Sequence, residues 1–169
     1  GARESRRETA AAQAAPRWRI APFDALCARE AHDLMALRQS VFVIEQACLF
    51  PEIDGRDPLA THVLAWRGET LAGCARLLPA GAKMAARSIG RVATARFARG
   101  GGLGRALMSR AIAHLLAQDA AAPIELSAQA HLEGFYASFG FRGFGAPYDE
   151  DGIAHLDMRL DPTQHFTGA

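Results

Sequence analysis

The sequence predicts one α/β domain. Short apolar runs with strand character alternate along the chain with segments of helical periodicity. A length of 169 residues, 50% of them apolar, suffices for one sizeable core but hardly for two. A glycine-rich turn that joins a predicted strand to a predicted helix is the third observation. No internal repeat interrupts this order.

The composition narrows the range of partners. A formal net charge of +1, with 22% charged residues, gives no overall field that would draw the chain to nucleic acid or to an anionic membrane. No stretch approaches the roughly 18 consecutive apolar residues of a membrane span, and no signal-peptide pattern is visible. The three cysteines lie far apart without zinc spacing. We expect no nucleic-acid partner, no membrane partner, no metal site and a cytoplasmic location.

The first sixteen residues differ from the rest of the chain. They mix charges and alanines and contain no large apolar side chain, so they have little to bury against a core. We expect residues 1–16 to form a disordered tail and residues 17–169 to form the domain.

The first half of the domain begins with a strand and a helical stretch. Asp24 is a suitable N-cap for a helix that continues to Gln46, either whole or broken near Leu37. Turn-forming residues then dominate a loop. The predicted elements are strand 18–20, helix 24–46, ordered loop 50–58, hairpin strands 61–66 and 71–78, and strand 88–95.

The second half begins with a helix directly after the glycine-rich turn. Apolar residues from Leu103 to Leu115 recur there at helical spacing. Gly140 suits the end of a second, shorter helix. The predicted elements are a helix from residue 103 to the break at 120–123, strand 124–128, helix 131–139, and strands 141–144 and 155–160 around an acidic turn at 149–152.

The glycine-rich turn over residues 99–104 has the order that an anion site requires. The first N–H groups of a helix point outward together, the helix dipole favours negative charge there, and glycines let a phosphate approach the backbone. We expect a diphosphate, and the alternative is a turn without a ligand. A dinucleotide fingerprint fails because Arg105 stands where its last glycine belongs, and a P-loop fails because no Gly-Lys-Ser/Thr is present.

Two motifs resemble those of the GNAT superfamily of N-acetyltransferases. The R-x-x-G-x-G sequence at residues 99–104 is similar to its acetyl-CoA diphosphate motif, and residues 129–141 are similar to its N-x-x-A-x-x-[LF]-Y-x-x-x-G-F segment. Gln129 replaces the usual Asn and Leu132 the usual Ala. Further motifs resemble the ElaA-type branch and cover nearly everything after residue 17, among them L-R-x-x-V-F-V-x-E-Q at 37–46, E-x-D-G-x-D at 52–57 and Y-D-E-D-G-I at 148–153.

The resemblance implies a fold, a co-substrate and a set of residues that bind it. The fold is a twisted mixed sheet whose two central strands splay apart to admit the pantetheine arm of acetyl-CoA. The acetyl group passes directly to an amine, so no protein nucleophile is needed. The residues assigned to the coenzyme are Val92, Ala93, Thr94, Arg99, Gly100, Gly101, Gly102, Leu103, Gly104, Arg105, Gln129 and Tyr136.

Tyr136 occupies the position from which many members of the superfamily protonate the leaving thiolate. A phenol is protonated at neutral pH and can donate that proton. The alternative is an aromatic side chain that packs beside Phe135 and Phe139, and both interpretations can hold together. A backbone N–H near Val92 or Ala93 would polarise the thioester carbonyl.

The acceptor ammonium must lose a proton before it attacks, and Glu45 is the first candidate for the general base. It follows an apolar run at residues 41–44, where partial burial would suit it for proton transfer near neutral pH. Its alternative role is an ion pair with Arg38 or another arginine. Further candidates for the base are Glu52, Asp54, His62 and His155.

Five residues are candidates for contact with the acceptor substrate: Arg38, Glu52, Asp54, His62 and Arg91. The arginines suit a carboxylate or phosphate and the acids suit a cationic amine. The alternatives are a buried ion-pair network and turn caps. The acidic run at residues 149–151 is most simply a solvated turn, with a lip for a cationic amine as the alternative.

These features predict an N-acetyltransferase that moves an acetyl group from acetyl-CoA to a primary amine of a small molecule or peptide. The alternative is a non-catalytic acyl-CoA-binding sensor or interaction module, because Gln129 departs from the motif and the base is not fixed. Transfer to a protein lysine or N-terminus is a third interpretation. The resemblance also allows a homodimer.

Overall fold

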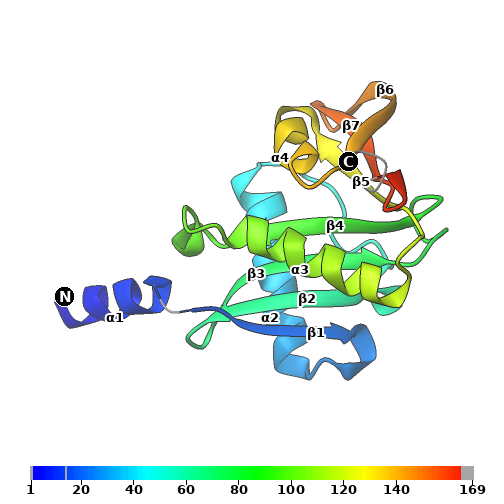
Figure 1. The fold of residues 1–169 in the computed structure, drawn as a ribbon. Coiled ribbons are helices and arrows are strands. Elements are labelled where there is room, and N and C mark those ends of the chain that lie inside the picture. The colour runs from blue at the N-terminus through cyan, green and yellow to red at the C-terminus, as the bar shows by residue number, and fades with distance from the viewer. Residues whose placement is uncertain (1, 14, 165–169) are drawn as a thin grey trace. The chain divides into compact units, whose positions relative to one another are not determined.

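In the computed structural model, the described residues, 2–13 and 15–164, form one open mixed sheet of seven strands in the order β1-β2-β3-β4-β5-β7-β6 (Figure 1). The predicted fold class is confirmed. Internal contacts divide the chain into two compact units. The first comprises Gly1–Arg76 and Arg91–Met108, and the second comprises Leu77–Gly90 and Ser109–Ala169.

The strands of the first unit confirm the predicted first strand and hairpin. Strand β1 (Arg17–Pro22) pairs antiparallel with β2 (Thr61–Arg67). A two-residue turn joins β2 to its neighbour β3 (Thr70–Leu78), and the positive φ of Gly68, 60°, suits this tight connection. Strand β4 (Arg87–Thr94) agrees closely with the strand predicted over residues 88–95.

Residues 23–45 form a series of helical segments and not one regular helix. The 3₁₀ helix η1 (Phe23–Ala25) precedes α2 (Ala28–Arg38), which continues into the π-helical segment η2 (Gln39–Glu45). Cys27 caps α2, and its N–H donates to Glu30 Oε1 at 2.9 Å, one half of a capping box. The predicted cap at residue 24 is therefore wrong, whereas the predicted break near residue 37 is confirmed.

The apolar core of the first unit joins α2 and η2 to the strands. Gly73 lets helix α3 (Leu103–Gln118) approach β3 closely, because a Cβ at this position would lie 2.9 Å from Leu107 Cδ1. This packing holds the start of α3, and the glycine turn before it, against the strands of the same unit. The buried cluster consists of Leu34, Leu37, Val41, Leu64, Trp66, Leu71, Cys74 and Ala93.

Within the second unit, β5 (Ile124–Gln129) pairs parallel with the start of β4. The ladder joins Arg87 to Ile124 and Ser88 to Glu125, the first residues of the two strands. A short ladder at this end agrees with the splayed central strands that the resemblance implies.

Two antiparallel strands, β7 (Ile153–Leu160) and β6 (Arg142–Glu150), follow β5 in the sheet. Strand β7 begins before its predicted start, and β6 ends after its predicted end. The first two residues of the predicted acidic turn therefore belong to β6. Asp151 and Gly152 form the turn with φ values of 54° and 80°, a pair that a two-residue hairpin turn uses.

The helix predicted over residues 131–139 divides in two. The 3₁₀ helix η5 (Ala130–Leu132) leads into the short helix α4 (Glu133–Ala137). Gly140 follows with a φ of 99°, as suits the residue after a helix end.

The segment predicted as a disordered tail includes helix α1 (Ala2–Gln13), a regular structure that the sequence analysis did not expect there. The side chains of residues 2–7 are exposed. The boundary between tail and domain at residue 17 stays a prediction. None of the helices in the described residues is long and apolar enough to span a membrane.

Candidate functional site

The glycine turn adopts backbone angles that other residues rarely take. The φ angle is 87° at Gly100 and 81° at Gly102, and a Cβ at either position would meet no atom within 4 Å. Backbone conformation, and not lack of space, therefore requires glycine here. None of the described residues accepts a hydrogen bond from the N–H groups of Gly102, Leu103 or Gly104. These donors lie at the start of α3, where the sequence predicts an anion, and that assignment stays a prediction.

The turn also brings Arg99 and Glu45 together. The Arg99 guanidinium donates to the Thr94 carbonyl oxygen from Nη2 at 2.9 Å and from Nε at 3.2 Å, and Nη2 lies 2.8 Å from Glu45 Oε2. The alternative role of Glu45, an ion pair with an arginine, is confirmed, and its partner is Arg99. Its role as the general base stays a prediction.

Arg67 is a residue at the turn that the sequence analysis missed. It ends β2, and its Nη2 atom lies 3.3 Å from the place that a Cβ on Gly101 would occupy. A side chain at Gly101 would press against this guanidinium, so here glycine provides space. No local motif marks Arg67, because its proximity to the turn depends on how β2 packs beside a segment more than thirty residues away.

The strand residues assigned to pantetheine lie at the end of β4. Ala93 is buried, and Val92 and Thr94 are half-buried. The strand is irregular just before them, because Arg91 has a φ of 49°, a value that side chains larger than glycine rarely adopt. The assignment of these residues, and of the exposed Arg105 on the first turn of α3, stays a prediction.

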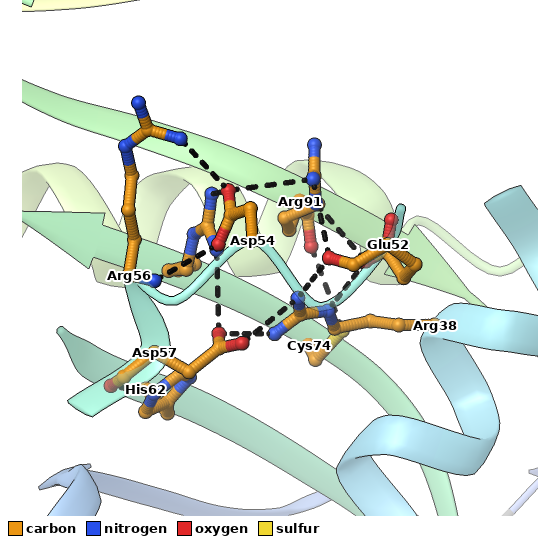
Figure 2. Close-up of polar contacts among 9 residues, drawn as sticks. Arg38, Glu52, Asp54, Arg56, Asp57, His62, Cys74 and Arg91 are labelled. Atoms are coloured by element: carbon orange, nitrogen blue, oxygen red, sulfur yellow. Dashed lines mark hydrogen bonds and ion pairs between the residues drawn. The ribbon is translucent and has the colours of Figure 1, made fainter. Parts of the chain in front are cut away.

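Three arginines and three acids form a buried ion-pair cluster in the first unit (Figure 2). It ties the loop that carries the acids to α2, β3 and β4. Its members are Arg38, Arg76 and Arg91 with Glu52, Asp54 and Asp57. Distances within the cluster include 2.7 Å from Arg38 Nε to Glu52 Oε1, 2.8 Å from Arg76 Nη1 to Asp54 Oδ1 and 3.0 Å from Arg91 Nε to Glu52 Oε1.

The cluster pairs three basic with three acidic side chains, and its hydrogen bonds favour the charged forms of Arg38, Asp54 and Asp57. Burial alone would lower the pKa of Arg38, but hydrogen bonds to Asp57 and Glu52 and their negative charges raise it. Burial alone would raise the pKa of Asp57, yet the guanidinium groups of Arg38 and Arg76 lower it. Arg76 and the backbone N–H of Arg56 act on Asp54 in the same way and lower its pKa too.

The cluster confirms the buried ion-pair network that the sequence analysis held as an alternative. Contact of Arg38, Glu52, Asp54 or Arg91 with the acceptor stays a prediction. His62 is 0% exposed, and its Nε2 lies 3.1 Å from the Asp57 carbonyl oxygen and donates to it. Burial lowers the pKa of His62 and keeps the ring neutral. This placement argues against contact between His62 and a substrate.

Tyr136, in the second unit, packs among aromatic side chains. Its ring meets the ring of Phe135 edge-on, with centroids 5.1 Å apart, and Phe135 meets Phe139 in the same way at 5.3 Å. Burial raises the pKa of Tyr136, so its hydroxyl keeps its proton at neutral pH. The packing role is confirmed, and the role as proton donor stays a prediction.

The second unit also presents a polar sheet face on β5, β7 and β6. Tyr148 donates from its hydroxyl to Asp157 Oδ1 at 2.7 Å and accepts a short hydrogen bond from Ser127. The Tyr148 ring stacks on His155, with centroids 5.9 Å apart and planes at 21°. His155 pairs across the sheet with Gln129. The sequence analysis gave no role to Ser127, Tyr148 or Asp157, because the sequence does not show that three strands bring them together.

Comparison with known proteins agrees with this arrangement. The model of the GNAT acetyltransferase domain matches residues 31–162. The chain is 36% identical over 149 residues to Protein ElaA of Escherichia coli K12, covering 87% of this chain and 97% of that one. It is 38% identical over 142 residues to UPF0039 protein sll0451 of Synechocystis, covering 83% of this chain and 92% of that one.

Solved structures give the same result. An acyl-CoA N-acyltransferase from Pseudomonas aeruginosa superposes with a TM-score of 0.83 at 38% identity, covering 86% of this chain and 99% of that one. The crystal structure of Escherichia coli ElaA gives a TM-score of 0.82 at 34% identity, covering 87% and 100%. The motifs, the sheet and these likenesses agree: the chain belongs to the GNAT acetyltransferase family and is similar to ElaA.

Proposed function

We propose that this chain is an N-acetyltransferase that moves an acetyl group from acetyl-CoA to a primary amine of a small molecule or peptide. Family membership supports acyl transfer from an acyl-CoA donor. The acetyl group and the amine acceptor are our proposal. The main support for this proposal is the glycine turn, where main-chain N–H groups without a hydrogen-bond partner lie near two guanidinium groups.

The first unit supplies what a diphosphate needs. The N–H groups of residues 102–104 point out of the start of α3, where the helix dipole favours negative charge. Arg99 and Arg67 add positive charge beside the turn. Guanidinium groups bind phosphate oxygens in pairs of hydrogen bonds, so both arginines suit the diphosphate of coenzyme A.

Tyr136 is the proton donor of the proposed reaction. In the proposed reaction the amine nitrogen attacks the thioester carbonyl carbon, a C–N bond forms and the C–S bond breaks with its electron pair on sulfur. One N–H bond of the attacking nitrogen breaks and its proton passes to solvent, the Tyr136 hydroxyl gives its proton to that sulfur, and the phenolate then recovers a proton from solvent. The raised pKa of Tyr136 suits this role, because the group enters each cycle protonated.

The first experiment measures coenzyme A binding by calorimetry and acetyl-CoA-dependent thiol release with polyamines, aminosugars, amino acids and peptides. We expect binding, and thiol release that requires an amine. Absence of binding would overturn the assignment of the glycine turn. Binding without release for any amine would overturn the proposed reaction.

The matched variants are Tyr136→Phe and Phe139→Leu. Both alter the same aromatic group, but only the first removes a hydroxyl. We expect Tyr136→Phe to lower kcat about 10²-fold, the lower end for loss of a general acid, with the dissociation constant of coenzyme A unchanged. Equal losses of kcat in both variants would show that Tyr136 acts through packing.

A second candidate function is an acyl-CoA sensor without turnover. The observation that favours it is the ion pair between Glu45 and Arg99, which engages the carboxylate predicted to be the base. A sensor would be stabilised by acetyl-CoA, would release no thiol and would respond identically in Tyr136→Phe. A cytoplasmic location and a homodimer stay predictions.

A further inference from the structure

We propose that His155 is the general base that takes the proton from the acceptor ammonium, an inference that rests on the proposed function. Imidazole is the side chain best suited to accept a proton near neutral pH. His155 lies on β7 directly opposite Gln129, the last residue of β5 and the one assigned to the pantetheine arm. The chain continues from Gln129 through η5 to the helix that carries Tyr136.

The His155 ring is held in one tautomer. Its Nδ1 lies 2.8 Å from the Ile153 carbonyl oxygen, and a carbonyl oxygen can only accept. Nδ1 therefore carries the hydrogen, and in the neutral ring Nε2 holds a lone pair. The side chain is 13% exposed, so it is neither sealed in the core nor freely hydrated.

The orientation of the ring is set from a second side. Tyr148 stacks on it, and Tyr148 is itself held by hydrogen bonds to Asp157 and Ser127. None of these three residues forms a hydrogen bond with Nε2 of His155. They are positioning residues, since they hold the plane of the ring and leave its basic nitrogen for another donor.

The charges around His155 favour a cation. Glu150 Oε2 lies 3.7 Å from Nε2, too far for a hydrogen bond but close enough to attract an approaching ammonium. The titratable groups that contact His155 or lie beside it on the same sheet face are Tyr148 and Glu150 on β6 and Asp157 on its own strand, and the exposed His131 lies on η5, which packs against β7. Further along that face Arg159 of β7 pairs with Glu125 of β5 at 2.8 Å, while β5 presents the uncharged Gln129 and Ser127 opposite His155 and Asp157.

The other candidates for the base are occupied or buried. Glu45 is paired with Arg99, and the acids of the ion-pair cluster face arginines. His62 is fully buried. His155 thus differs from the rest of the candidate set, because it combines a defined lone pair, partial exposure and an anionic neighbour.

The proposed step transfers one proton. The ammonium N–H bond breaks, its electron pair stays on nitrogen as the nucleophilic lone pair, and Nε2 becomes an N–H of an imidazolium. The neutral amine then attacks the thioester as described above. The imidazolium releases its proton to solvent, and the overall reaction yields an amide, free thiol and one proton.

The test uses His155→Asn, with His114→Gln as the matched control. Asparagine retains an N–H that can donate to the Ile153 carbonyl oxygen but has no counterpart of Nε2, whereas His114 is a half-buried histidine on α3 whose Nε2 lies 3.2 Å from Gln118 Nε2. Each protein is assayed at neutral pH with the best aliphatic acceptor of the panel and with its fluorinated, weakly basic analogue, which is already neutral. Calorimetry with coenzyme A checks that each protein is folded.

We expect His155→Asn to lower kcat about 10²-fold or more with the basic acceptor, as for loss of a general base, and to leave the weakly basic analogue nearly unaffected. Added imidazole should restore part of the activity of His155→Ala. Equal losses with both acceptors, or no loss, would overturn the role of His155 while the proposed function stands. Absence of turnover by the wild-type protein would overturn both.

Discussion

Replacement of Arg38 by Met is expected to destabilise the protein by about 3–5 kcal/mol, because it removes one arginine partner from each of two buried carboxylates. Arg38 is 0% exposed, and it donates to Glu52 Oε1 at 2.7 Å and to both carboxylate oxygens of Asp57. Methionine replaces the aliphatic stem but donates no hydrogen bond. Arg76 and Arg91 still face these acids, which places the expected loss near the lower end of the range.

The loss depends on pH in a defined direction. In the wild-type protein the pKa of Asp57 is lowered, so its contribution to stability is present above the pKa of the unfolded chain, about 3.9, and is lost as the pH falls through the folded value. The variant lacks most of this contribution. The difference in free energy of unfolding between the two proteins is therefore largest at neutral pH and decreases below about pH 4.

Urea unfolding followed by circular dichroism, at neutral pH and at about pH 3, below the unfolded pKa of Asp57, measures both effects. A loss of about 3 kcal/mol corresponds to a decrease of roughly 6–12 °C in Tm for a chain of this size. Arg56→Met is the control, since Arg56 is 39% exposed and lies 3.3 Å from Asp54, and we expect a loss below about 1 kcal/mol. The reasoning fails if Arg38→Met matches this control or if its loss is equal at both pH values.

Three further predictions concern the glycine turn and the thiols. Arg67→Ala should weaken coenzyme A binding about tenfold, as expected for one lost charge-assisted contact, whereas Arg17→Ala, which removes a guanidinium stacked on Trp66, should leave the calorimetric dissociation constant unchanged. Glu45→Gln should tighten coenzyme A binding, because it removes the carboxylate that competes for Arg99; weaker binding would contradict this explanation. Burial raises the pKa of the Cys74 thiol to about 12. Iodoacetamide near neutral pH should therefore label the exposed Cys27 and spare Cys74 in the native protein, as mass spectrometry of the labelled protein measures. Labelling of Cys74 in the native protein would contradict this prediction.

The features that the sequence predicts correctly are those that depend on local pattern. Short apolar runs mark the strands, and the glycines at residues 100 and 102 mark a turn because their φ angles exclude most other residues. The cap of α2 shows the limit of such patterns. Asp24 is the better cap by residue type, yet the chain enters a 3₁₀ turn there, and α2 begins after Cys27.

The partners of charged side chains could not be predicted, because they depend on long-range packing. Arg38 and Asp57 lie nineteen residues apart on different elements, and Arg76 reaches Asp54 from β3. Their residue types suggest pairing but not its pattern. For the same reason, the sequence did not distinguish His155 from the other candidate bases. The tautomer of His155 follows from its hydrogen bond to a backbone carbonyl oxygen, and the orientation of its ring follows from stacking against a residue of a neighbouring strand.

The ion pair between Glu45 and Arg99 indicates that Glu45 acts on diphosphate binding, whereas removal of the acceptor's proton depends on another residue. Arg99 is held over the end of β4 by the Thr94 carbonyl oxygen and by Glu45, so the cation needed for a diphosphate is already positioned beside the turn. A diphosphate carries more negative charge than one carboxylate and competes for the same guanidinium. A change at Glu45 should therefore act first on coenzyme A affinity, whereas a change at His155 should act on kcat with basic acceptors. Because the two changes move different constants, measurements on both variants with one acceptor assign the base and the diphosphate contact independently.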